Sequence, residues 1–275
     1  MRRIQRRPSL RRFKGGLWYG EMVRERRLFA LREGLGGTGR GTYRLRTTGL
    51  RVVVRHGRYD PWALHEVIRA GEYTPPRPLV TMIGREPRRV VDLGANVGFF
   101  GIHTLATYPG ASVVGFEPDP DNAASMRAAI RLNGLEDRWE LIEAAASNED
   151  GELRFYGGRG SNSRLAREGE VEVEGTVTVP AVDVFRWLDD VDLLKIDIEG
   201  GEWAILGDPR FARARPRAVV LEYHSLMCPQ DNPRRAVREL LEGAGYVTHS
   251  PPADENPEDE PFWGVGVMWG WIEER

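Results

Sequence analysis

The sequence has little of three features that would otherwise decide its class: cysteine, long apolar runs and charge of one sign. Cys228 is the only cysteine in 275 residues, which excludes an internal disulfide framework and agrees with a reducing compartment. No apolar run approaches the roughly 20 residues that a membrane-spanning helix needs. The formal net charge of −2 selects neither nucleic acid nor an acidic substrate. Because no apolar segment follows the basic N-terminus, as it would in a secretory signal, we expect a cytoplasmic protein.

What the sequence does contain is a glycine turn between two apolar strands. An apolar run from Arg89 predicts a buried parallel strand that ends in a turn bracketed by Gly94 and Gly98. A second apolar strand, at 112–116, leads to Glu117. The separation of about twenty residues from Gly94 to Glu117 is the offset at which a Rossmann-type unit places an acid on a ribose diol. The pattern therefore predicts a nucleoside cofactor at the start of the helix that follows the turn.

Two polar residues in this turn favour one kind of nucleoside cofactor. A dinucleotide site prefers G-x-G-x-x-G, whose middle glycine makes room for pyrophosphate, and Asn96 stands at that place. Asp92 precedes the first glycine, where a carboxylate repels pyrophosphate but suits a cofactor that carries an ammonium and a sulfonium group. The sequence thus favours S-adenosylmethionine (SAM) over NAD, with an NAD-linked oxidoreductase as an alternative. The expected cofactor-binding residues are Asp92, Gly94, Asn96, Gly98, Glu117 and Asp119.

Three motifs together resemble the FkbM family of SAM-dependent methyltransferases. They are VDLGANVGFF at 91–100, GFEPDP at 115–120 and LKIDIEGGE at 194–202, and the resemblance covers about residues 43–250. It implies an α/β fold of the Rossmann-like class I type, with a mostly parallel seven-stranded sheet whose last strand is antiparallel. It also implies methylation of a hydroxyl on a sugar or small natural product. The chain lacks the Asn/Asp-Pro-Pro-aromatic signature that many methyltransferases acting on base amino groups contain, and this absence argues against methylation of a nucleic-acid base.

The order of the expected elements gives three segments. We expect a basic N-terminal extension and linker at 1–41, a hairpin and helix at 42–88, and the SAM-binding domain at 89–275. Asp121 is expected to cap the helix that ends near Asn133. Further strands are expected at 139–146, 191–196, 218–221, 246–249 and 262–272, and a hairpin at 171–179.

Asp197 and His224 are the candidate catalytic residues. Both follow expected parallel strands, and ligands in open α/β sheets bind outside the carboxyl ends of strands. His224 is the first candidate base, because its unperturbed pKa lies near 6.5, and Asp197 is the competing base. A divalent cation held by Asp197 and Glu222, with or without His224, is an alternative, although no spacing demands a metal. Glu199 is a further candidate for the site, and His103 is a weaker candidate base.

Residues 1–40 are dense in arginine, with aromatic and aliphatic residues interleaved. The simpler interpretation is a solvated extension or a helix lying on the domain. The alternative is a basic arm that contacts phosphate on nucleic acid or an anionic membrane. A nucleic-acid-directed methyltransferase, or an RNA-binding module, is therefore the second function to consider. The primary expectation for the partner remains a small-molecule hydroxyl acceptor, whose pocket would be shaped by segments 42–75 and 157–180.

Overall fold

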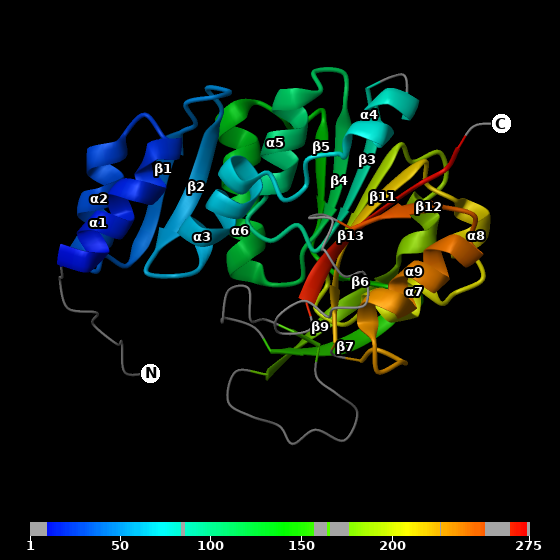
Figure 1. Cartoon of the computed structure of the whole chain (residues 1–275). Coiled ribbons are helices and arrows are strands. Elements are labelled where there is room, and N and C mark those ends of the chain that lie inside the picture. Colours follow the sequence, from blue (N-terminus) through cyan, green and yellow to red (C-terminus); the bar gives the residue numbers. More distant parts are fainter. Residues whose placement is uncertain are drawn as a thin grey trace.

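A seven-stranded sheet forms the centre of the molecule in the computed structural model, which describes residues 10–83, 86–156, 164–165, 176–225, 227–250 and 265–273. Its strand order is β12-β13-β11-β10-β3-β4-β5 (Figure 1). The strands are β3 (Arg89–Leu93), β4 (Ser112–Phe116), β5 (Trp139–Ile142), β10 (Leu193–Ile196), β11 (Ala218–His224), β12 (Val247–His249) and β13 (Val265–Trp271). Only β13 runs antiparallel to its neighbours in this sheet. The Rossmann-like fold with an antiparallel last strand is confirmed.

Helices cover both faces of this sheet, as its uninterrupted apolar strands require. Val90 and Val91 are both fully buried but belong to different hydrophobic clusters, since successive strand residues point to opposite faces. The α-helices that follow β3 are α5 (Phe99–Thr107), α6 (Pro120–Asn133), α7 (Glu202–Leu206), α8 (Phe211–Ala214) and α9 (Pro233–Gly243). No helix in the described ranges combines the length and apolar character needed to cross a membrane.

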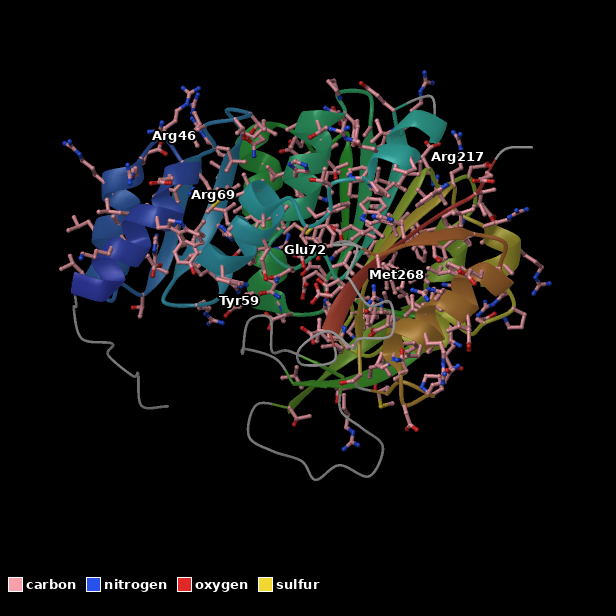
Figure 2. All side chains as sticks on the ribbon, in the orientation of Figure 1. Arg46, Tyr59, Arg69, Glu72, Arg217 and Met268 are labelled. Carbon is pink, nitrogen blue, oxygen red and sulfur yellow. The ribbon has the colours of Figure 1, made fainter. Side chains whose placement is uncertain are left out.

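The N-terminal part folds onto this domain as two helices over a hairpin (Figure 1). The elements are α1 (Leu10–Tyr19), η1 (Gly20–Met22), α2 (Arg26–Gly34), β1 (Gly39–Arg44) and β2 (Arg51–His56). They are followed by α3 (Asp60–His65), a π-helical turn η2 (Glu66–Ala70) and α4 (Arg77–Ile83). The expected hairpin and the helix that begins near Pro61 are confirmed. Figure 2 shows Tyr59 and Glu72 where these elements meet the central sheet.

Two local expectations are wrong. The single strand expected at 139–146 is split, because the chain leaves the central sheet after Ile142 and pairs again through β6 (Ala145–Ser147). This strand belongs to a second sheet of order β6-β9-β7-β8, with β7 (Gly151–Tyr156), β8 (Arg164–Leu165) and β9 (Thr176–Asp183). The cap of α6 is Asp119 rather than Asp121: its carboxylate accepts the backbone N–H of Asp121. The turn of the hairpin expected at 171–179 lies outside the described residues.

Candidate active site

The turn after β3 brings two backbone segments into close contact. Gly94 has φ +81°, and a Cβ atom on it would lie 1.7 Å from the carbonyl oxygen of Asp197, at the end of β10. Only glycine fits such a contact. Gly98 also has a positive φ, but its Cβ would meet the ring of Trp139 at 2.8 Å. Gly94 is therefore required for the junction of the two strand ends, and Gly98 for the packing of α5.

Glu117 holds the glycine turn and the loop after β4 together. One carboxylate oxygen accepts the backbone N–H of Asn96 at 2.7 Å. The other accepts the backbone N–H of Asp119 at 2.7 Å and the side chain of Asn122 at 3.2 Å. Burial raises the pKa of Glu117 to about 7, against the opposing effect of these donors. The predicted contact of Glu117 with a ribose stays a prediction, as does that of Asp119.

Lys195 lies at this junction and was not among the residues expected there from the sequence. Its Nζ donates to the carbonyl of Gly94 at 2.7 Å and lies 3.2 Å from Asp92 Oδ1 and 3.4 Å from Asp197 Oδ2. Burial alone would lower the pKa of Lys195, but Asp92 and Asp197 raise it above its ordinary value. A lysine inside an otherwise apolar strand was the available signal, since buried charges need partners.

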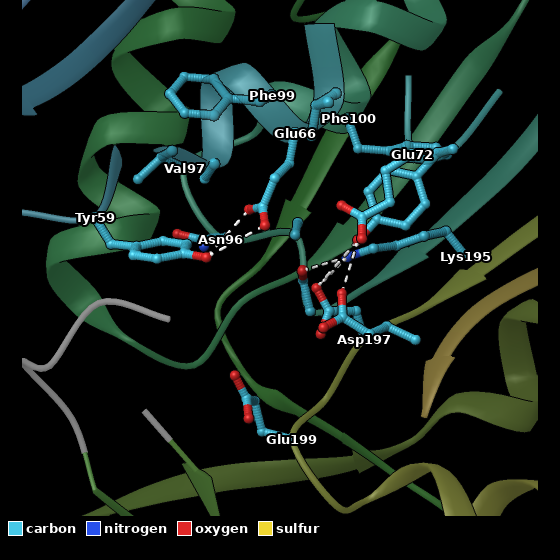
Figure 3. Close-up of a pocket in the computed structure, with 16 residues that line it drawn as sticks. Tyr59, Glu66, Glu72, Asn96, Val97, Phe99, Phe100, Lys195, Asp197 and Glu199 are labelled. Carbon is cyan, nitrogen blue, oxygen red and sulfur yellow. Dashed lines mark hydrogen bonds and ion pairs between the residues drawn. The ribbon is translucent and has the colours of Figure 1, made fainter. Parts of the chain in front are cut away.

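A pocket opens between this junction and the segment that carries α3 and η2. Figure 3 shows its walls: the turn after β3 and the start of α5 on one side, and side chains from β10 and residues 59–73 on the others. Gly94 and Asn96 line it, whereas Asp92, Gly98, Glu117 and Asp119 are buried and are not part of its described lining.

The candidate catalytic residues Asp197 and His224 lie close together, as expected from the carboxyl ends of neighbouring strands, but of the two only Asp197 is part of the described pocket lining. One carboxylate oxygen each of Asp197 and Glu199 and one ring nitrogen of His224, atoms that could coordinate a metal, all lie within 4.8 Å of one another. The Tyr73 hydroxyl lies 3.5 Å from Asp197 Oδ2 and 3.4 Å from Glu222 Oε2, and it can donate to either carboxylate. These groups therefore form one polar cluster at the rim of β10 and β11.

His224 is surrounded by carboxylates. Its Nδ1 lies 3.2 Å from Glu202, and its Nε2 lies 3.5 Å from Glu199 and 3.7 Å from Glu222. Burial alone would lower the pKa of His224, but the hydrogen bond and charge of Glu202, with the charges of Glu199 and Asp197, raise it to about 10. The ring is therefore protonated at neutral pH and cannot accept a proton in that state.

Two other histidines have different surroundings. His103 lies on α5, outside the described lining of the pocket, and burial lowers its pKa. His65 stacks on Trp18 with ring centroids 4.2 Å apart. Of the two segments expected to shape an acceptor pocket, 42–75 lines this pocket through Tyr59, Glu66, Glu72 and Tyr73, and most of 157–180 lies outside the described residues. Acceptor binding there stays a prediction.

The residues present fit SAM. The pocket lining contains more carboxylates than cations, which suits a cofactor carrying a sulfonium and an ammonium group. Neither oxygen of Asp92 has a hydrogen-bond partner in the described ranges, apart from the ion pair with Lys195. A pyrophosphate would meet these carboxylates at unfavourable Coulomb energy.

Comparisons with known proteins identify the family. The methyltransferase FkbM domain matches residues 92–248. The 2-O-methyltransferase NoeI of Sinorhizobium fredii is 24% identical over 64% of this chain and 79% of its own length. The 31-O-demethyl-FK506 methyltransferase FkbM of Streptomyces tacrolimicus is 28% identical over 58% of this chain and 72% of its own length.

Among solved structures, the chain is similar to precorrin-6y C5,15-methyltransferase from Geobacter metallireducens. The two are 15% identical, the match covers 72% of this chain and 90% of that chain, and the TM-score is 0.39. The family match favours a methyltransferase over an NAD-linked oxidoreductase or an RNA-binding module. With the strand order and the pocket described above, it shows that the chain belongs to the FkbM methyltransferase family and is a SAM-dependent enzyme of class I fold.

Proposed function

We propose that the chain methylates a hydroxyl oxygen on a sugar or small natural product. Two relatives are named for oxygen methylation, one at a 2-hydroxyl and one on FK506. The observation that carries the proposal is the carboxylate of Asp197, which lines the pocket at the end of β10 and keeps a quarter of its side chain exposed (26%). Such a group can receive the proton that a hydroxyl must lose on methylation.

We place SAM against the turn after β3. Gly94 and Asn96 would face it, while Asp92 supplies negative charge from behind the turn and Glu117 fixes the loop that contains Asn96. When bound, SAM supplies an electrophilic methyl group on sulfonium. The contribution of the protein is alignment of the acceptor with that group, which lowers the barrier by positioning alone.

Asp197 is the proposed base. Lys195 and Tyr73 hold its Oδ2 atom at 3.4 and 3.5 Å and thereby fix the direction of the carboxylate. We propose that Asp197 accepts the acceptor's hydroxyl proton, while the protonated His224 balances the charge of Glu199 and Glu222. His224 therefore assists as a cation in this proposal, and its role as the base is the alternative.

A divalent cation is the second mechanism at the same atoms. Asp197, Glu199 and His224 offer one nitrogen and two carboxylate oxygens within 4.8 Å, and hard cations prefer carboxylate oxygen. Glu222 lies beside them, in contact with Tyr73. Activity lost on dialysis against EDTA and restored by Mg²⁺ or Mn²⁺ would favour this mechanism. Unchanged activity after chelation would favour Asp197 acting as a base without metal.

The proposal is tested by turnover with simple hydroxyl compounds. Release of S-adenosylhomocysteine would be measured with a panel of methyl glycosides, with total RNA as the comparison acceptor. We expect turnover with glycosides and a decrease of about 100-fold or more in kcat for Asp197→Asn, with S-adenosylhomocysteine affinity retained. The exposed Asp189→Asn is the matched control. Methylation of RNA alone, or full activity of Asp197→Asn, would contradict the proposal.

A further inference from the structure

The pocket has a charge imbalance that the methyl donor site does not explain by itself. Its described lining contains five carboxylates and one lysine. The charge of that lysine, Lys195, is already shared between Asp92 and Asp197. His224, the other nearby cation, faces Glu199, Glu202 and Glu222. The acids of the opposite wall are left without a counter-ion in the described part of the chain.

Those acids are Glu66 and Glu72, which come from η2 and from the turn that follows it. Both oxygens of Glu66 lie 3.3 Å from the Tyr59 hydroxyl. The backbone N–H of Glu72 donates to the carbonyl of Glu66 at 3.2 Å, but its carboxylate makes no hydrogen bond or ion pair with the residues that the structure describes, although Glu72 lies in the pocket wall. Figure 3 shows both carboxylates directed into the space that Asn96 and Asp197 also face.

Leaving these carboxylates without a cation is unfavourable. Burial raises the pKa of both residues. For Glu72 the pKa reaches about 7, because the charges of Glu66 and Asp197 add to the effect of burial, while Lys195 opposes it. A ligand that brings positive charge to this wall would relieve both the like-charge repulsion and the desolvation of the acids. The aromatic ring of Tyr59, which also lines the pocket, can bind a cation through its π face.

We infer that the methyl acceptor is a hydroxyl compound carrying a positively charged amine, such as an amino sugar, and that Glu66 and Glu72 select it. The inference rests on the proposed function, because acceptor and methyl donor share the pocket. Both residues lie before residue 92, where the FkbM match begins, so the N-terminal segment adds this selectivity to the shared methyltransferase domain. Acceptors with a phosphate or carboxylate are disfavoured by the same charges.

The test compares two acceptor probes that differ mainly in charge. Kanamycin A, a polyhydroxylated tetra-amine, and its neutral tetra-N-acetyl derivative would be titrated calorimetrically into the full chain saturated with S-adenosylhomocysteine at pH 7.5. We expect kanamycin A to bind at least tenfold more tightly. The variant Glu66→Gln/Glu72→Gln should reduce this preference to less than threefold, and the exposed Glu140→Gln should leave it unchanged. Circular dichroism melting would verify that each variant is folded.

The remaining outcomes are distinct. Equal affinity for both probes, or binding of neither, would overturn the inference. If the double variant lost S-adenosylhomocysteine affinity while keeping its amine preference, Glu66 and Glu72 would bind the cofactor's ammonium group, and the inference would also be wrong. Failure of the wild-type chain to bind S-adenosylhomocysteine would instead contradict the cofactor placement in the proposed function.

Discussion

At the scale of single residues, the site depends on a buried lysine. Lys195 is 3% exposed and Asp92 is fully buried, so each charge relies on the other and on Asp197. A buried ion pair contributes little net stability, but removal of one partner leaves an uncompensated charge in a medium of low dielectric. Lys195 also binds the carbonyl of Gly94. One side chain therefore couples the charge of the pocket to the shape of the glycine turn.

We predict that Lys195→Met lowers the free energy of unfolding by about 3–5 kcal/mol, because Asp92 is left charged and buried. Urea denaturation followed by circular dichroism would measure the loss. The double variant Asp92→Asn/Lys195→Met removes both charges, so it should recover more than half of the lost stability. Strictly additive losses in the double variant, or a wild-type stability of Lys195→Met, would show that the pair is not coupled in this way.

At the scale of elements, the site is formed where β3 and β10 end side by side. Leu93 of β3 pairs with Ile196 of β10 in parallel register, so the chain continuing from each strand must pass the other closely. Gly94 permits this passage, and Asp197 comes directly after β10, the neighbouring strand. The geometry of the pocket is thus set by backbone contact before any ligand binds.

We predict that Gly94→Ala lowers stability by at least about 2 kcal/mol, since its φ of +81° and the 1.7 Å approach to Asp197 both exclude a Cβ atom. It should also weaken S-adenosylhomocysteine binding more than tenfold. Gly110→Ala is the matched control, because a Cβ there meets nothing within 4 Å. Thermal melting and calorimetric titration would measure the two effects, and equal behaviour of both variants would refute this role of Gly94.

The strands and the meeting of Asp197 with His224 could be predicted because both follow from local patterns. Apolar runs identify parallel strands, and their carboxyl ends share one edge. The break after Ile142 could not be predicted, since it depends on whether β4 or β9 is the better partner for the residues that follow. The position of Glu72 was equally hidden, because no local pattern specifies how the N-terminal segment packs on the central sheet.

At the scale of the whole molecule, the N-terminal elements share the hydrophobic core of the methyltransferase domain. Phe29 of α2 is fully buried, with its ring centroid 4.9 Å from Tyr43 and 5.1 Å from His56. The same cluster includes Val90 of the central sheet. The described part of the arginine-dense region is therefore built onto the domain, as the simpler interpretation of the sequence expected.

We predict that Phe29→Ala lowers the free energy of unfolding by about 3–5 kcal/mol in a single cooperative transition. Leu28→Ala, one residue away and 43% exposed, should change it by less than about 0.5 kcal/mol. Denaturation monitored by tryptophan fluorescence would compare them. Two separate transitions, or equal small effects, would show that the N-terminal elements are stabilised independently of the domain.

The most direct test of the site is a crystal structure of the chain with S-adenosylhomocysteine. We predict that the ligand lies against Gly94 and Asn96 with its sulfur facing the carboxylate of Asp197, and with open space between the sulfur and Glu72 for an acceptor. Ligand density elsewhere on the molecule, with this pocket filled by side chains, would contradict the placement of the active site between the ends of β3 and β10.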